Sequence, residues 1–279
     1  MKYIILTIKG FFMGLANLIP GVSGGTIAIT LGIYNKLISC ISHLFSNLKD
    51  NLKFILPILV GIALSIVSLS NVMSYALNNY LFITILFFVG AIIGGIPMLY
   101  KRVKNTMSIS SVLIFLLTFT LVITLTFLKG DNNVIIKNNL VDLIKLFVVG
   151  IIAAATMVVP GVSGSAVLMT LGYYTPIIDL IKELTSMNNI LSNLITLFVF
   201  GVGVLLGILL IAKLIEYLLN KYEVKTYYGI LGFVISSIIS IVIQNLFMNG
   251  LISIGALDIV FGILLFFLGF IVAYKLGDK

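Results

Sequence analysis

Six long apolar runs constrain the fold of this chain more than any other feature. Each run is long enough to cross a bilayer, which takes about 20 residues. The six lie at residues 54–75, 81–100, 109–128, 194–219, 227–244 and 255–274. Only 9% of the residues are charged, against roughly 25% in a soluble domain, and the mean hydropathy is +1.25. We therefore predict an all-α polytopic membrane protein.

Two further apolar segments, 3–42 and 140–181, each contain a glycine-rich motif near the middle. The motif reads "PGVSGGTIAITLG" from Pro20 and "PGVSGSAVLMTLG" from Pro160. Ten of nineteen positions are identical when 20–38 is aligned with 160–178. Matched glycines before and after the motif extend this similarity. We predict an internal duplication with halves 1–130 and 131–279.

The distribution of lysine and arginine indicates how the halves are oriented. If each motif segment is a re-entrant helical hairpin and the N-terminus is cytoplasmic, 13 of the 17 cations lie inside. If the motif segments cross fully, only 10 do. The positive-inside bias favours the first arrangement. Three crossings per half then give the halves opposite orientations, the inverted repeat of many transporters, and place both termini in the cytoplasm.

The motif has the chemistry of an anion-binding turn. Proline breaks a helix and glycine lets the chain reverse, so Pro20 and Pro160 are predicted to mark hairpin tips. Ser23 and Ser163 are natural N-caps of the apolar helical runs that follow. A helix start presents unpaired N–H groups and the positive end of the helix dipole, which together bind phosphate well.

The two tips are expected to meet near the membrane midplane, because irregular backbone there must be satisfied by protein or by a water-filled cavity. The alternative is that the small residues only allow close helix packing, the role assigned to glycines 90, 94, 95, 201, 203 and 207. The candidate phosphate-binding residues are Gly21, Ser23, Gly24, Gly25, Thr26, Gly161, Ser163, Gly164 and Ser165.

Four cations are candidates for an accessory charge beside a bound anion. Lys9 and Lys145 lie in the first arms of the hairpins, and Lys101 and Arg102 lie at a cytoplasmic span end. Snorkelling to the headgroups and the topology bias explain them equally well. The same bias explains the net charge of +8 without any nucleic-acid partner.

Few residues of the chain are suited to catalysis or to metal binding. The one histidine, His43, is expected to stand alone in a loop, and no cysteine or carboxylate cluster has ligand spacing. No nucleophile and base are paired at a span centre, so we expect no catalytic residue, metal or cofactor. Tyr34 and Tyr174 recur in both copies and are interpreted as interfacial anchors. A carrier fits better than a channel, since the spans have no polar stripe.

The two PGVSG hairpins, a GGxP-type turn at Gly94 to Pro97 and the duplicated layout of the whole chain resemble the PopT family of polyprenyl-phosphate transporters. This resemblance implies a transporter in the bacterial cytoplasmic membrane. Its substrate would be undecaprenyl phosphate, the lipid carrier of peptidoglycan and other envelope polymers, returned from the outer to the cytoplasmic leaflet.

The paired hairpins also resemble the DedA transporters, whose sites are associated with membrane-embedded arginines. The one arginine here, Arg102, lies at a span end, which shifts weight to backbone N–H groups and to the hydroxyl groups of the two tips. Coupling to protons or to sodium stays open. The alternatives are a transporter of a small soluble anion and a pore or scaffold without a substrate.

Overall fold

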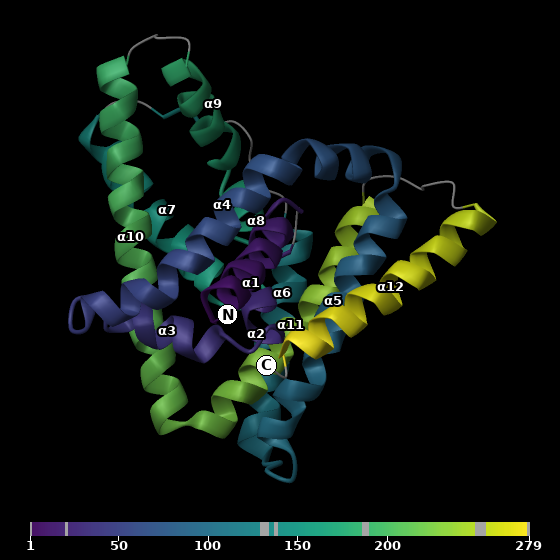
Figure 1. Cartoon of the computed structure of the whole chain (residues 1–279). Coiled ribbons are helices and arrows are strands. Elements are labelled where there is room, and N and C mark those ends of the chain that lie inside the picture. Colours follow the sequence, from purple (N-terminus) through teal and green to yellow (C-terminus); the bar gives the residue numbers. More distant parts are fainter. Residues whose placement is uncertain are drawn as a thin grey trace.

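Helices alone make up the regular structure of the computed structural model within the residues that it describes (Figure 1), namely 2–19, 22–128, 134–136, 139–185, 190–248 and 255–277. The first half contains α1 Lys2–Asn17, α2 Gly24–Thr30, α3 Tyr34–Ser42, α4 Leu48–Asn79, α5 Leu81–Val103 and α6 Ile109–Phe127. The second half contains α7 Leu140–Val158, α8 Gly164–Thr170, α9 Tyr174–Thr185, α10 Ile190–Lys221, α11 Glu223–Val242, a π-helix Ile243–Met248 and α12 Ala256–Gly277. The order of a helix, a seven-residue helix, a short helix and three long helices thus occurs twice.

Seven of the described helices are long and apolar enough to cross a membrane: α4, α5, α6, α7, α10, α11 and α12. The six apolar runs of the sequence correspond to all of these except α7. This confirms the predicted all-α polytopic membrane protein. The first arm of the second motif segment, α7, is itself of spanning length.

The second arm of each motif segment differs from the prediction, because it is not one continuous apolar helix. Helices α2 and α8 end after seven residues, and α8 and α9 are bent by 103°. Gly32 and Gly172 have φ values of 71° and 77°, a left-handed conformation that glycine adopts without strain. The amide of Gly32 donates to the carbonyl of Ile29 and the next amide to Ala28. This is the Schellman pattern, which ends a helix, and it recurs at Gly172.

Glycines let α1 pack closely on α4 in the first half and α7 pack closely on α10 in the second half. A Cβ on Gly10 of α1 would collide with the carbonyl of Ile58 in α4. In the second half, a Cβ on Gly203 of α10 would collide with the carbonyl of Phe147 in α7. Small residues that let backbones approach are typical of membrane helix contacts. The packing role expected for Gly201 is wrong, since a Cβ there would meet nothing within 4 Å.

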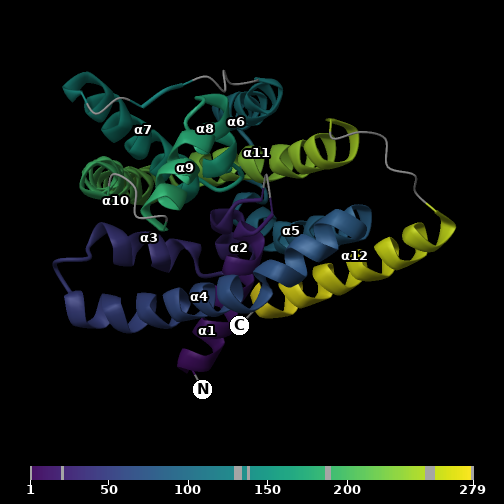
Figure 2. The same cartoon turned by 90° about the horizontal axis from the view of Figure 1, so that it is seen from above.

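The last helix of each half packs on the other half. Figure 2 shows one layer that holds α1 to α5 with α12 and another that holds α6 to α11. Gly90 and Gly94 of α5 lie against the backbone of Phe266 and Phe270 in α12, and Gly232 of α11 lies against α6. The expected GGxP-type turn is therefore wrong. Gly94 to Pro97 lie inside α5, where the glycines serve close packing.

Candidate functional site

The two copies of the motif touch each other between the layers. The amide of Gly161 donates to the hydroxyl of Thr26 at 2.7 Å, and the phenol of Tyr34 donates to the carbonyl of Val158 at 3.1 Å. Both bonds join residues more than a hundred positions apart. The expectation that the two tips meet is therefore met in the structure.

The two serines cap the short helices in the way that the sequence predicts. Ser23 and Ser163 have extended backbones, as N-cap residues do. The Ser23 hydroxyl accepts from the amide of Gly25 at 3.2 Å, and the Ser163 hydroxyl accepts from the amide of Ala166 at 3.4 Å. The Ser163 hydroxyl also lies 2.9 Å from that of Ser165.

The first turns of the two short helices differ in how many N–H groups are free. In α2, the amide of Gly24 donates to the Asn17 side chain at 3.0 Å and that of Thr26 to the Ser23 carbonyl at 3.0 Å. In α8, the amides of Gly164 and Ser165 have no hydrogen-bond acceptor among the described residues. Among the described residues, the second tip therefore has two N–H groups without an acceptor, whereas the equivalent N–H groups of the first tip are bonded.

A cavity of 630 Å³ lies between the tips. Six of the predicted residues line it, and they are Ser23, Gly24, Gly25, Ser163, Gly164 and Ser165. The other lining residues are apolar apart from two, Asn17 and Tyr34, and none of them is charged. They come from α1, α3, α4, α7, α8 and α10 and include Met13, Leu37, Ile38, Ile41, Ile62, Phe200 and Ile208. The cavity thus has a polar end, formed by the two tips, and an otherwise apolar wall.

Two of the predicted site residues that the structure describes do not line this cavity. Thr26 is 1% exposed, and its hydroxyl is used by Gly161, so this pair holds the tips together. Gly161 has a φ of 83° and lies against the backbone of Phe233. Gly21 lies outside the described residues.

The four candidate cations also lie away from the tip cavity. Lys9 is 4% exposed and donates to the carbonyl of Leu31 at 2.7 Å. Its charge therefore lies at the negative end of α2. Lys145 pairs with its neighbour Asp142 at 3.4 Å. Lys101 is exposed, and Arg102 pairs with Glu223 at 3.5 Å.

Two sequence interpretations are wrong at α3. Tyr34 is not an interfacial anchor, because it is 4% exposed and lines the tip cavity. Its counterpart in the second copy, Tyr174, does not line the cavity. His43 does not stand alone, because its Nδ1 lies 3.2 Å from a carboxylate oxygen of Glu216 in α10. In the described part of the chain, no group of three or more His, Cys, Asp or Glu residues could hold a metal ion.

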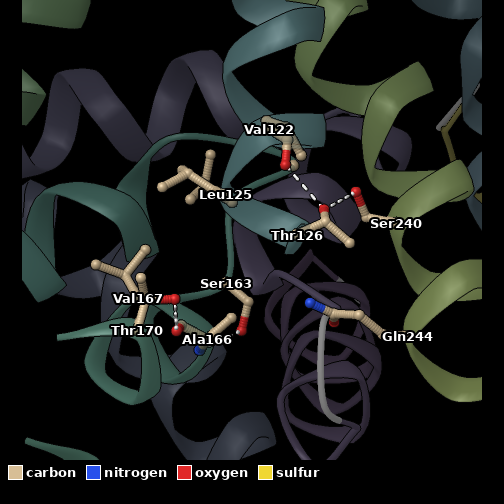
Figure 3. A pocket seen from close by; sticks show the side chains of 11 residues that line it. Val122, Leu125, Thr126, Ser163, Ala166, Val167, Thr170, Ser240 and Gln244 are labelled. Atoms are coloured by element: carbon tan, nitrogen blue, oxygen red, sulfur yellow. Dashed lines mark hydrogen bonds between the residues drawn. The ribbon is translucent and has the colours of Figure 1, made fainter. Parts of the chain in front are cut away.

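A second, much smaller pocket of 30 Å³ adjoins the second tip (Figure 3). Ser163 lines both this pocket and the tip cavity. Across the pocket, the hydroxyls of Thr126 in α6 and Ser240 in α11 lie 2.6 Å apart. The second tip therefore rests against the α6–α11 pair.

The comparison with known families fits this arrangement. A model of the undecaprenyl phosphate translocase-like family matches residues 13–249. This range includes both copies of the motif and every residue that lines the tip cavity. The chain belongs to this family. Membership of this translocase-like family confirms the resemblance that the two PGVSG motifs indicated.

Two similar proteins support this family assignment. A protein of Staphylococcus aureus (strain NCTC 8325 / PS 47) named "Polyprenyl-phosphate transporter" is 34% identical over 242 residues, which cover 84% of each chain. A protein of the same name from Vibrio cholerae serotype O1 is 26% identical over 252 residues, 85% of this chain and 77% of the relative. No solved structure gives a significant match to this translocase-like chain.

Proposed function

We propose that this protein transports undecaprenyl phosphate without altering it chemically. It would return the lipid carrier from the outer to the cytoplasmic leaflet of a bacterial cytoplasmic membrane. The observation that carries this proposal is that both copies of the motif line one cavity with an otherwise apolar wall. The family and the names of the two relatives support the class of substrate.

The chemistry of the cavity favours a lipid phosphate over a small soluble anion. Side chains such as Phe200, Ile208 and Ile62 would contact an isoprenoid chain, and a soluble anion would gain nothing from them. The serine hydroxyls and the free amides of Gly164 and Ser165 form the polar end. A phosphate at this end would accept hydrogen bonds that partly replace the water it loses.

The protein would move only the headgroup through its interior. Burying a phosphate without partners is very costly, and the two tips lower this cost with N–H groups and hydroxyls fixed in advance. The isoprenoid units next to the phosphate would contact the apolar wall of the cavity, and the rest of the tail would stay in contact with lipid. The nine motif residues named from the sequence are proposed as this binding region, with Thr26 and Gly161 as its clamp.

The packing of the helices supports a two-fold repeat, which the positive-inside bias favours as an inverted one. Helices α5 and α11 occupy equivalent positions in the two halves, and each packs on the last helix of the other half. Helix α3 packs on α4 of its own half, as α9 packs on α10, but α3 also packs on α10 across the layers, and the described part of α9 has no comparable contact with α4. If both termini are cytoplasmic, as the positive-inside bias favours, α3 covers the cytoplasmic side of the cavity. Release of the headgroup toward the cytoplasm would then require α3 to move away from α10.

Binding of candidate ligands tests the site directly. We would compare undecaprenyl phosphate, inorganic phosphate and an anionic phospholipid by native mass spectrometry. The test variant is Ser23→Gly with Ser163→Gly, because glycine at an N-cap costs little stability. Ser65→Ala is the control, since this buried serine does not line the cavity.

We expect the wild type and Ser65→Ala to retain undecaprenyl phosphate selectively and the double serine variant to lose most of this binding. Equal binding of all three ligands by the wild type would contradict the proposed substrate. Unchanged binding in the double variant would contradict the proposed site.

A further inference from the structure

Another cavity, of 190 Å³, is lined by positively charged side chains, which the tip cavity lacks. Lys36 of α3 and Arg102 of α5 both line it, together with the side chains of Asn35 and Tyr227. Tyr34 lines this cavity and the tip cavity alike. The two cavities are therefore neighbours that share one buried phenol.

Four helices, α2, α3, α5 and α11, and the bend at Gly32 build this cationic cavity. Gly32, with its positive φ, ends α2 and redirects the chain, so that α3 brings Asn35 and Lys36 to the cavity. Helix α5 contributes Arg102, and α11 contributes Tyr227. Both layers of the molecule thus take part.

Contacts among these side chains hold the donors in place. The side-chain amide of Asn35 donates to the Tyr227 hydroxyl at 2.6 Å. The phenolic hydrogen of Tyr227 is therefore free to donate to another group. The Arg102 guanidinium lies over the Tyr227 ring at 5.8 Å from its centroid. The Lys36 ammonium lies 5.0 Å from the centroid of the Phe54 ring in α4, which does not line the cavity, so this side chain would turn to reach a phosphate bound there.

The charge balance around the cavity is positive. Glu223 pairs with Arg102 at 3.5 Å, with both side chains about half exposed, and such pairs are weak. Glu223 is not a lining residue, and no carboxylate is among the residues that line the cavity. A guanidinium, an ammonium and a phenol together suit a phosphate, which arginine can bind through two parallel hydrogen bonds.

We propose that this cavity is a second phosphate site, which receives the headgroup of the lipid phosphate when it leaves the tips on the α3 side. The proposal rests on the proposed function, because it concerns the same substrate. The headgroup would pass from a neutral site to a positive one. Tyr34 lines both cavities and donates to the carbonyl of Val158. Its side chain would have to move for the headgroup to pass from one cavity to the other.

Counting bound ligands separates the two sites. The probe is farnesyl phosphate, a short isoprenoid phosphate, measured by native mass spectrometry on the whole purified protein. We expect two equivalents on the wild type, one on Lys36→Gln with Arg102→Gln, and one on Ser23→Gly with Ser163→Gly. Lys101→Gln is the matched control, because it removes a neighbouring exposed cation that does not line the cavity. It should keep two equivalents.

The affinity of the second site for farnesyl phosphate is a second measurement, and it distinguishes residues that bind the phosphate from residues that only support the fold. Removing hydrogen bonds to two charged groups should weaken the second site about tenfold or more. Glu223→Gln should tighten it, because the carboxylate that competes for Arg102 is gone. Arg102→Lys, with Lys36 unchanged, should bind the probe more tightly than the Lys36→Gln and Arg102→Gln double variant, because it keeps both positive charges.

Each other outcome has one meaning. If the Lys36 and Arg102 double variant still folds, by its thermal midpoint, and keeps every equivalent that the wild type binds, the second site is overturned while the tip site stands. If only the serine variant keeps all its equivalents, the tip site fails and the second site stands. If phosphatidylglycerol displaces the probe from the second site equally well, the cavity is a general headgroup contact and the proposal is overturned.

Discussion

At the scale of single residues, one hydroxyl joins the two copies of the motif. Thr26 accepts from the amide of Gly161, but the equivalent position in the second copy is Ala166. A mirror bond from the second copy to the first therefore cannot form. The repeat is symmetric in its caps and asymmetric in its clamp.

Thr26→Val tests this clamp. The change keeps the shape of the side chain but leaves the Gly161 amide buried without its partner, which costs about 1–3 kcal/mol. We expect a lower thermal midpoint for the detergent-purified protein. Thr30→Val is the control, because its hydroxyl bonds only within its own helix, to Ile27, and it should change the midpoint less. An equal loss in both variants would argue against a clamp.

Local residue roles could be predicted from the sequence, and long-range ones could not. Ser23 and Ser163 are caps because an N-cap depends on residues two or three positions away. The bond from Tyr34 to Val158 spans 124 positions. Nothing in the local pattern separates that tyrosine from those that anchor helices at the membrane surface, and so its role was misjudged.

At the scale of helices, the face on which a glycine lies decides whether it packs. Gly201 and Gly203 are two residues apart in α10, which turns them by roughly 200° around the helix. Gly203 therefore lies against α7, while Gly201 faces open space. The sequence marks both as small and could not tell them apart without knowledge of the partner helix.

Gly203→Val with Gly201→Val as its matched control tests this assignment. A side chain at 203 would collide with the backbone of Phe147 and force α7 away from α10. Overpacking of this kind costs about 1–3 kcal/mol. We expect a clear drop in thermal midpoint for Gly203→Val and little change for Gly201→Val. Equal midpoints would show that the α7–α10 contact tolerates a larger spacing.

The helices themselves were largely predictable, because a span needs only length and apolar composition. The break after each tip was missed, although the motif ends in Leu-Gly in both copies. Glycine inside an apolar run usually reads as a packing residue in a membrane protein. Only the backbone shows that Gly32 and Gly172 end their helices with a positive φ.

At the scale of the whole molecule, the proposed transport cycle requires α3 to leave α10. Among the described residues, four polar links join α5, α3 or the C-cap of α3 to the second half: Tyr34 to Val158, Asn35 to Tyr227, His43 to Glu216 and Arg102 to Glu223. Side chains of α3 also line the tip cavity. The equivalent helix of the second half, α9, packs on α10 of its own half, as α3 also packs on α4. These links tie α3 and α5 to the second half across the layers.

A reversible cross-link tests this motion. His43→Cys with Glu216→Cys, in a Cys40→Ser background that removes the one native thiol, would be joined by a cleavable thiosulfonate reagent. We expect the cross-linked protein to bind lipid phosphate but to transport it at least about tenfold more slowly, with recovery on reduction. The single-cysteine variants, treated alike, are the control. Full transport by the cross-linked protein would rule out movement of α3.

Transbilayer movement of undecaprenyl phosphate in proteoliposomes is the measurement that tests the central claim most directly. A phosphatase added outside would report the lipid that reaches the outer leaflet. We predict that wild-type protein makes the inner pool accessible and that Ser23→Gly with Ser163→Gly, at equal incorporation and thermal midpoint, does so far more slowly. Movement no faster than in protein-free liposomes, or equal rates in both proteins, would contradict a lipid phosphate carrier built on these two tips.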